Sequence, residues 1–298
     1  NNTGADISLN GDLDITSAGS NAHGFSATGG GTLTMLGTSN TVDSTGGIGV
    51  LIDGMTISNG GVRFEEVNVT TSANGMLFNN VTGGPITIGT IGNEPGDSGT
   101  ISNTIGDAIS ITNTANITIT GVEINNSDPV AGVRISKTNS AQSIVNLNDL
   151  EINGGSHGVN VTGGGTGALN LTINDTTIND PEEFGLRFDN VDFGTIAVND
   201  VPLDGGAANP TAVGIEIVGS NATFTFNAGT TITDFGGTDF HVNGGTGNIT
   251  FNSDITNTSG RSIHIENITG GSVNFGASST ITDTGMGILV NDNSGGTI

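Results

Sequence analysis

One repeating unit runs through the whole chain and constrains its fold more than any other feature. In each copy a turn precedes an apolar–x–apolar triplet, and the first residue of the triplet recurs every 23 to 33 residues. The positions are Phe25, Val50, Met76, Ile109, Val133, Val159, Leu186, Ile215, Phe240, Ile263 and Ile288. A glycine stands directly before most of them. A period of this length indicates a solenoid, in which neighbouring repeats stack and bury a common core.

Each unit is expected to hold three short strands separated by turns rich in Gly, Asn, Asp and Ser. The triplet is the second strand. The first strand carries one apolar row: Ile15, Val42, Val69, Ile101, Ile124, Ile152, Ile178, Leu203, Ile232, Ile255 and Ile281. The third strand is another alternating triplet, found at Leu33–Met35, Ile86–Ile88, Ile117–Ile119, Ile196–Val198, Phe224–Phe226, Ile249–Phe251 and Val273–Phe275. We therefore predict an all-β, right-handed, three-sided parallel β-helix of about eleven rungs, a rung being one turn of the solenoid, as a single domain over residues 1–298.

Two side-chain rows predict contacts between rungs. Turn asparagines recur after the third strand at Asn148, Asn174, Asn199, Asn227 and Asn252, where their amides can form a ladder. Inside the core, Phe226, Phe251 and Phe275 take the same position of consecutive rungs and are expected to stack.

The composition of the chain excludes some classes of binding partner. Five Lys and Arg face 29 Asp and Glu, for a net charge of −24, which disfavours nucleic acid and anionic lipid. No apolar run approaches the length of a membrane span, so we expect no membrane insertion. The first and last residues resemble interrupted copies of the repeat. This suggests a segment of a longer repeat array or a subunit that stacks end to end.

The run "GTISNTIGDAISITNTANITITGVEINNS" (99–127) resembles the right-handed parallel β-helix repeats of large bacterial surface and secreted proteins. That superfamily also includes pectate lyases and polygalacturonases. The resemblance implies the fold and an extracellular or cell-surface location on a bacterium. It leaves activity open, because such helices carry enzymes, adhesins and passive stalks.

A candidate binding face follows from the outward residue of the second strand. In the middle of the chain this residue is, rung by rung, Arg134, Asn160, Arg187, Glu216, His241 and His264. One interpretation is a polar groove for a polysaccharide, with Glu216 and His241 as an acid–base pair. The other is cross-strand charge pairing with a structural role, Arg187 with Glu216 and Glu216 with His241. We assign no catalytic residue.

Enzyme and metal motifs are weak. "GSHGVNV" (155–161) and "VRISK" (133–137) are similar to polygalacturonase segments, but their order is reversed and the Asp cluster of that family is missing. A histidine also stands before a turn glycine in "AHGFSA" (22–27), without any partner, so His157 is interpreted as a turn residue rather than a catalyst. We assign no metal ligand and expect no cofactor, although the Asp-rich turns at 92–99 and 290–296 could hold Ca²⁺.

These observations favour a non-enzymatic extracellular structural solenoid: a surface stalk, an adhesin passenger or a filament subunit. Its partners would be flanking repeats or further copies of itself. The alternative is a polysaccharide-binding or polysaccharide-cleaving β-helix that uses the Arg134–His264 face. A third hypothesis, ice binding, rests on outward threonines of the third strand at Thr34, Thr87, Thr118, Thr225 and Thr250.

Overall fold

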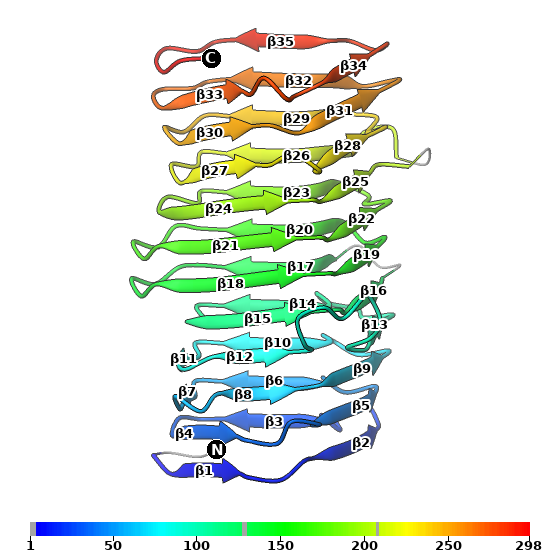
Figure 1. The fold of residues 1–298 in the computed structure, drawn as a ribbon, viewed down its shortest axis with the longest axis vertical. Helices are drawn as coiled ribbons and strands as arrows, with labels where there is room; N and C mark the ends of the chain where they lie inside the picture. Colours follow the sequence, from blue (N-terminus) through cyan, green and yellow to red (C-terminus); the bar gives the residue numbers. More distant parts are fainter. Residues whose placement is uncertain (1–3, 127–129, 207–208) are drawn as a thin grey trace.

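A computed structural model describes residues 4–126, 130–206 and 209–298, and within them the regular elements are all β-strands. The strands wind into a stack of about eleven rungs, with the N-terminus at one end and the C-terminus at the other (Figure 1). Strand pairs between neighbouring rungs are parallel, as in Val133↔Val159 and Val159↔Leu186. The prediction of an all-β parallel solenoid is confirmed.

Two sheets run the length of the stack. Sheet 1 holds the first strand of each rung: β2 (Asp14–Ala18), β5 (Thr41–Thr45), β9 (Glu66–Thr70), β13 (Thr100–Ser102), β16 (Glu123–Asn125), β19 (Glu151–Asn153), β22 (Thr177–Asn179), β25 (Pro202–Asp204), β28 (Thr231–Thr233), β31 (Asp254–Asn257) and β34 (Ile281–Asp283). Sheet 2 holds the second strands: β3 (Phe25–Thr28), β6 (Val50–Asp53), β10 (Met76–Asn79), β14 (Ile109–Thr112), β17 (Ala131–Ser136), β20 (His157–Thr162), β23 (Phe184–Asp189), β26 (Val213–Val218), β29 (Thr238–Asn243), β32 (Arg261–Glu266) and β35 (Ile288–Asn291).

The third side is divided. Sheet 3 consists of β8 (Val62–Phe64), β12 (Ile86–Ile88), β15 (Asn116–Thr120), β18 (Ser143–Asn148), β21 (Leu169–Asn174), β24 (Gly194–Asn199), β27 (Thr223–Phe226), β30 (Asn248–Phe251) and β33 (Ser272–Phe275). Near the N-terminus a four-stranded sheet precedes it: β1 (Asp6–Leu9), β4 (Thr32–Met35), β7 (Thr56–Ile57) and β11 (Thr82–Gly83). The predicted triplet Leu33–Met35 is a strand with Leu33 and Met35 buried, but it lies in this smaller sheet rather than in sheet 3, and Leu33 pairs there with Ile57.

A second register differs in sheet 1. We expected Val42 to align with Val69, but it pairs with Val67, and Val69 pairs onward with Ile101. β9 is long enough to offer valines at two inward positions, and its two neighbours use different ones. Elsewhere in sheet 1 the predicted row is continuous, for example through Ile152↔Ile178.

The core lies between the sheets and is filled by the inward rows. Ile135, in the middle of the stack, is almost fully buried. The predicted phenylalanine stack is present, with ring centroids 6.0 Å apart for Phe226 and Phe251 and 5.5 Å for Phe251 and Phe275. Phe240 from sheet 2 joins it at 4.6 Å from Phe251. Rings at these distances in tilted arrangements add to the stability from burial.

The glycine before the triplet is explained by close packing. A Cβ added at Gly158 would lie 2.5 Å from Ile178 Cγ2 and 2.6 Å from the Gly185 carbonyl oxygen. Any larger residue must displace the inward side chain of sheet 1 or the backbone of the next rung. Most rungs therefore carry glycine at this point, where the chain passes from sheet 1 to sheet 2.

The asparagine ladder is present over most of its predicted length. The Asn174 amide donates to Asn148 Oδ1 at 2.8 Å, and the Asn199 amide donates to Asn174 Oδ1 at 2.6 Å. Asn227 continues the ladder onto Asn199. Within the described residues the amide ladder ends at Asn227 and does not include Asn252. A second ladder, which we did not predict, joins Asn179, Asn153 and Asn125 in sheet 1.

Candidate functional site

The candidate face is the outer surface of sheet 2, from β17 to β32. Parallel pairing places the predicted residues side by side in one row, because each is the middle residue of an aligned triplet. The pairs are Arg134↔Asn160, Asn160↔Arg187, Arg187↔Glu216, Glu216↔His241 and His241↔His264. The sequence therefore identified which polar residues are neighbours on this face.

The arginines are paired with carboxylates. Arg187 Nε donates to Glu216 Oε2 at 3.0 Å, and its Nη2 lies 3.3 Å from Asp189 Oδ2. Arg134 Nε donates to Asp107 Oδ2 at 2.6 Å. Each guanidinium thus has an anionic partner within the protein, as expected for the structural interpretation of the row.

Asn160 departs from the expected groove. It points outward in register, yet it is only 3% exposed, and its Oδ1 has no hydrogen-bond partner among the described residues. Its neighbours in the row are two long arginine side chains, which can cover a short amide. A ligand running along the row would therefore meet Arg134 and Arg187 before Asn160.

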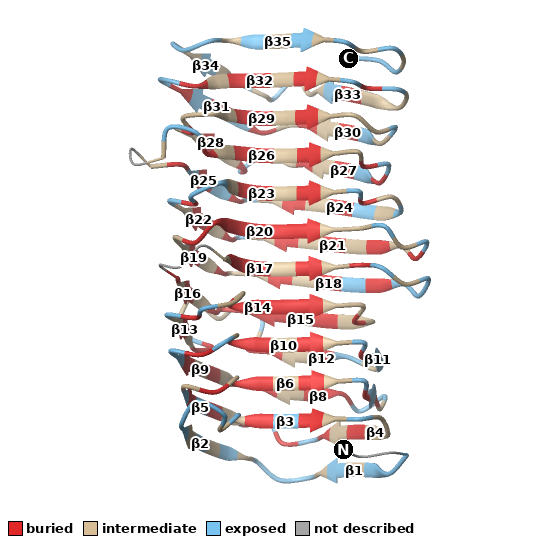
Figure 2. Cartoon of the chain, turned by 180° about the vertical axis from the view of Figure 1, so that it is seen from behind, coloured by how far each residue is buried: buried red, intermediate tan, exposed pale blue. Residues whose placement is uncertain are grey.

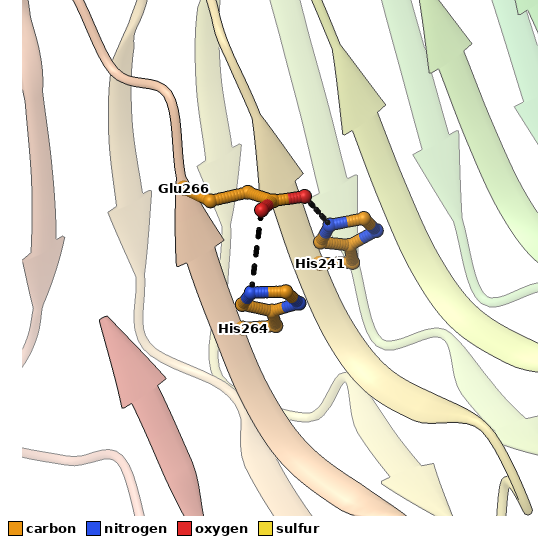
Figure 3. Close-up of side chains that lie close together, drawn as sticks. All are labelled: His241, His264 and Glu266. Carbon is orange, nitrogen blue, oxygen red and sulfur yellow. Dashed lines mark hydrogen bonds and ion pairs between the residues drawn. The ribbon is translucent and has the colours of Figure 1, made fainter. Parts of the chain in front are cut away.

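The histidine end of the row forms a compact cluster with two glutamates. His241 Nδ1 donates to Glu216 Oε1 at 3.3 Å, and His241 Nε2 lies 3.3 Å from Glu266 Oε1. His264 Nε2 lies 3.6 Å from Glu266 Oε2 (Figure 3). The two imidazole rings are stacked, with centroids 4.9 Å apart and planes 13° from parallel.

Hydrogen bonds within this cluster shift the pKa values of His241 and Glu216 in opposite directions, each toward the charged form. Burial alone would lower the pKa of His241, but its hydrogen bonds to Glu216 and Glu266 outweigh burial and raise the pKa above its usual value. Burial likewise opposes ionisation of Glu216, yet hydrogen bonds from His241 and Arg187 lower its pKa. Glu216 is thus held as a carboxylate between the Arg187 guanidinium and the His241 imidazole, which suits an ion pair with Arg187 better than a general acid.

The interpretation of His157 as a turn residue was wrong. His157 is the first residue of β20 and is buried, with its ring stacked on Phe184 at a centroid distance of 5.2 Å. Ser156 Oγ lies 2.7 Å from His157 Nδ1. Burial of the imidazole lowers the pKa of His157 below its usual value. These contacts give His157 a packing role at the start of β20, in the middle of sheet 2.

Sequence reasoning missed the partners of the row. Glu266 lies two residues after His264 on the same strand, so the period-two rule places both on the outer face. Asp107 lies in the turn before β14, where no periodicity applies. The signal for Glu266 was therefore present in the sequence, whereas the pairing of Asp107 with Arg134 depends on the path of the turn.

The residues able to bind a metal were likewise not assigned. In the part of the chain that the structure describes, His241, His264 and Glu266 each offer one ligand atom, and these atoms all lie within 4.8 Å of one another. Calcium binding at the Asp-rich turns at 92–99 and 290–296 stays a prediction.

The threonine row is discontinuous. Thr87 pairs with Thr118 and Thr225 pairs with Thr250, but Thr34 belongs to the smaller sheet. Asn146 and Ala197 interrupt the row between these pairs. Thr172 lies in the same row between Asn146 and Ala197, so the outward threonines do not form one unbroken row among the described strands of sheet 3, and ice binding stays a prediction.

Comparison with known proteins yields no relative. No protein family, no curated sequence and no solved structure matches the chain. Among the described residues there is also no helix with the length and apolarity needed to cross a bilayer.

Proposed function

We propose that this protein is a non-enzymatic structural solenoid of the bacterial cell surface or extracellular space, a stalk, adhesin passenger or filament subunit whose ends stack on further rungs. One observation carries the proposal: the apolar core is open at the end of the stack. Ile288 and Val290 of β35 are 58% and 48% exposed, whereas Ile263 and Ile265, their partners in the preceding rung, are fully buried (Figure 2).

The opposite end has the same character. Ile7, Leu9, Phe25 and Leu33 line an apolar hollow of about 350 Å³ beside the first strands. Terminal strands also present backbone groups on the side away from the stack, and such edges pair readily with another strand. A further rung at either end would cover both the apolar side chains and the strand edge. Flanking repeats of the same chain or another subunit could supply it.

The ion pairs on the candidate face support a structural role for its charged residues. Arg134, Arg187 and Glu216 are engaged by protein partners. Residues committed to each other in this way stabilise the stacking of rungs, each pair by roughly 0.2–1 kcal/mol.

Sedimentation velocity and electron microscopy over a concentration series test the proposal. We expect concentration-dependent, end-to-end rods, and we expect the double variant Ile288→Asp, Val290→Asp to remain monomeric. Ile91 is 88% exposed on the side of the stack, so Ile91→Asp is the matched control and should associate as the unmodified protein does. A protein that stays monomeric at every concentration, or a double variant that still forms rods, would refute end stacking.

The alternative is polysaccharide binding or cleavage by the same face. It is favoured by the partial exposure of Arg134 and Arg187, whose guanidinium groups could donate to sugar hydroxyls. A glycan array and a reducing-end assay distinguish the two functions. Glycan binding that is lost in Arg187→Ala but kept in Arg63→Ala, which changes an arginine of sheet 3, would favour the alternative. No binding to any glycan would favour the scaffold.

A further inference from the structure

We propose that His241, His264 and Glu266 form a binding site for a divalent transition-metal ion of the Zn²⁺ type, which links two neighbouring rungs. His241 lies on β29, and His264 and Glu266 lie on β32. These strands pair directly in sheet 2, so the site is built across one strand interface rather than on loops.

Three potential metal-ligand atoms, one each from His241, His264 and Glu266, lie close together. Both Nε2 atoms face the Glu266 carboxylate, at 3.3 Å from His241 and 3.6 Å from His264 (Figure 3). Zinc requires ligand bonds of about 2.0–2.2 Å, so the donors of a tetrahedral site must lie roughly 3.3–3.6 Å apart around the ion. In this structure the three donor atoms lie within 4.8 Å of one another. Rotation of the two imidazoles about their side-chain bonds can close this gap, because the backbone already has the required register.

Glu216 gives the arrangement a feature typical of metal-binding histidines. Its carboxylate accepts the Nδ1–H of His241 at 3.3 Å, on the side of the ring opposite to Glu266. A carboxylate in that position holds a proton on Nδ1, which leaves Nε2 as the nitrogen that binds the ion, and it increases the basicity of the ring. On binding, the ion replaces the Nε2 proton of His241, which is released to solvent.

His264 has a related partner in the last rung. Its Nε2 lies 2.9 Å from Asn291 Oδ1 of β35. Without metal this nitrogen donates to the amide oxygen. With metal, the proton moves to Nδ1 or is lost, and the amide oxygen or a water molecule can take the fourth position of a tetrahedral site.

Burial and charge favour a bound cation. The three side chains are only 16–21% exposed, so they are largely shielded from solvent yet still reachable by an ion. Glu216 and Glu266 add two carboxylates, and the whole chain carries a net charge of −24. Two imidazoles with one carboxylate select Zn²⁺, Ni²⁺, Co²⁺ or Cu²⁺ over Ca²⁺ and Mg²⁺, which prefer all-oxygen sites.

Isothermal titration calorimetry with ZnCl₂ tests the site, using protein without an affinity tag after treatment with a chelator. We expect one ion per chain, binding at least tenfold weaker in His264→Leu and in Glu266→Gln, and no displacement by excess Ca²⁺. His264→Leu should fold normally, because leucine already occupies this row at Leu51, Leu77 and Leu289. The control His23→Leu removes an exposed histidine of a distant turn and should bind as the unmodified protein does.

A thermal unfolding series gives a second readout. Zn²⁺ should raise the melting temperature of the unmodified protein and of His23→Leu, but not that of His264→Leu, because a ligand that binds only the folded state stabilises it. Absence of saturable Zn²⁺ binding would overturn the proposal. So would equal affinity in the unmodified protein and in both Glu266→Gln and His264→Leu.

Discussion

Replacing Asp239 by asparagine should change how the stability of the protein depends on pH. Asp239 lies directly before Phe240, at the point where Gly214 stands in the preceding rung. Its side chain is fully buried, and Oδ1 has no hydrogen-bond partner in the described structure. The amide of Asn257 donates to Oδ2 at 2.6 Å. Burial raises the pKa of this carboxyl from 3.8 to about 8, although the Asn257 amide opposes the shift.

The sign follows from proton binding. In the unfolded chain Asp239 loses its proton near pH 4, whereas in the folded protein it keeps the proton to about pH 8. Between these values unfolding releases a proton, so rising pH favours the unfolded state. The free energy of unfolding therefore falls by about 1.4 kcal/mol per pH unit from this group alone. Between pH 5 and pH 7 the loss amounts to about 3 kcal/mol.

The asparagine variant has the same shape and cannot ionise, so it should lack this dependence. We expect the stability difference between Asp239→Asn and the unmodified protein to shift by about 3 kcal/mol in favour of the variant from pH 5 to pH 7. Urea unfolding followed by far-ultraviolet circular dichroism is the suitable assay, because the chain has neither Trp nor Tyr for fluorescence. A chelator keeps the neighbouring His241 cluster free of metal.

Asp6 provides the matched control. It is exposed on β1, so Asp6→Asn makes the same chemical change outside the core. Parallel stability curves for Asp239→Asn and the unmodified protein would refute the reasoning, because they would mean that Asp239 is ionised in the folded state.

Three further substitutions test the stack itself by the same urea assay. Ile135→Asp places an unpaired carboxylate in the core and should cost several kcal/mol, whereas Ile135→Val should cost about 1 kcal/mol; similar losses for both would mean that position 135 is not inside. Gly158→Ala forces a methyl group to 2.5 Å from Ile178 Cγ2 and should destabilise by more than 1 kcal/mol, while Gly11→Ala, with open space around it, should be tolerated. Asn174→Ala removes two ladder bonds and should cost about 1–3 kcal/mol, and an unchanged midpoint would show that the ladder contributes nothing.

The fold was predictable because each rung repeats the same pattern of apolar residues and turns. An apolar residue at every second position defines the inward face, and a turn at a fixed interval returns the chain to the same place. Residues with the same place in the repeat therefore become neighbours, as Glu216 and His241 do. The prediction failed where one strand offers two equivalent positions: both Val67 and Val69 point inward, and alternation does not choose between them.

The candidate site was predictable only in part. The row on sheet 2 followed from the repeat, but the burial of Asn160 did not, because it depends on where its long neighbours lie. Asp239 was also missed, since its place in the repeat says nothing about the loss of solvent around its carboxyl.

The sequence by itself determined the parallel solenoid, its rung boundaries and the order of polar residues along its outer face, because these depend on spacing along the chain. Only the tertiary structure decided which side chains contact one another across rungs, such as Glu266 with both His241 and His264. It also decided which groups lose water, as Asp239 does. Side-chain reach and solvent access depend on distances in three dimensions, and these distances arise only when the rungs are stacked.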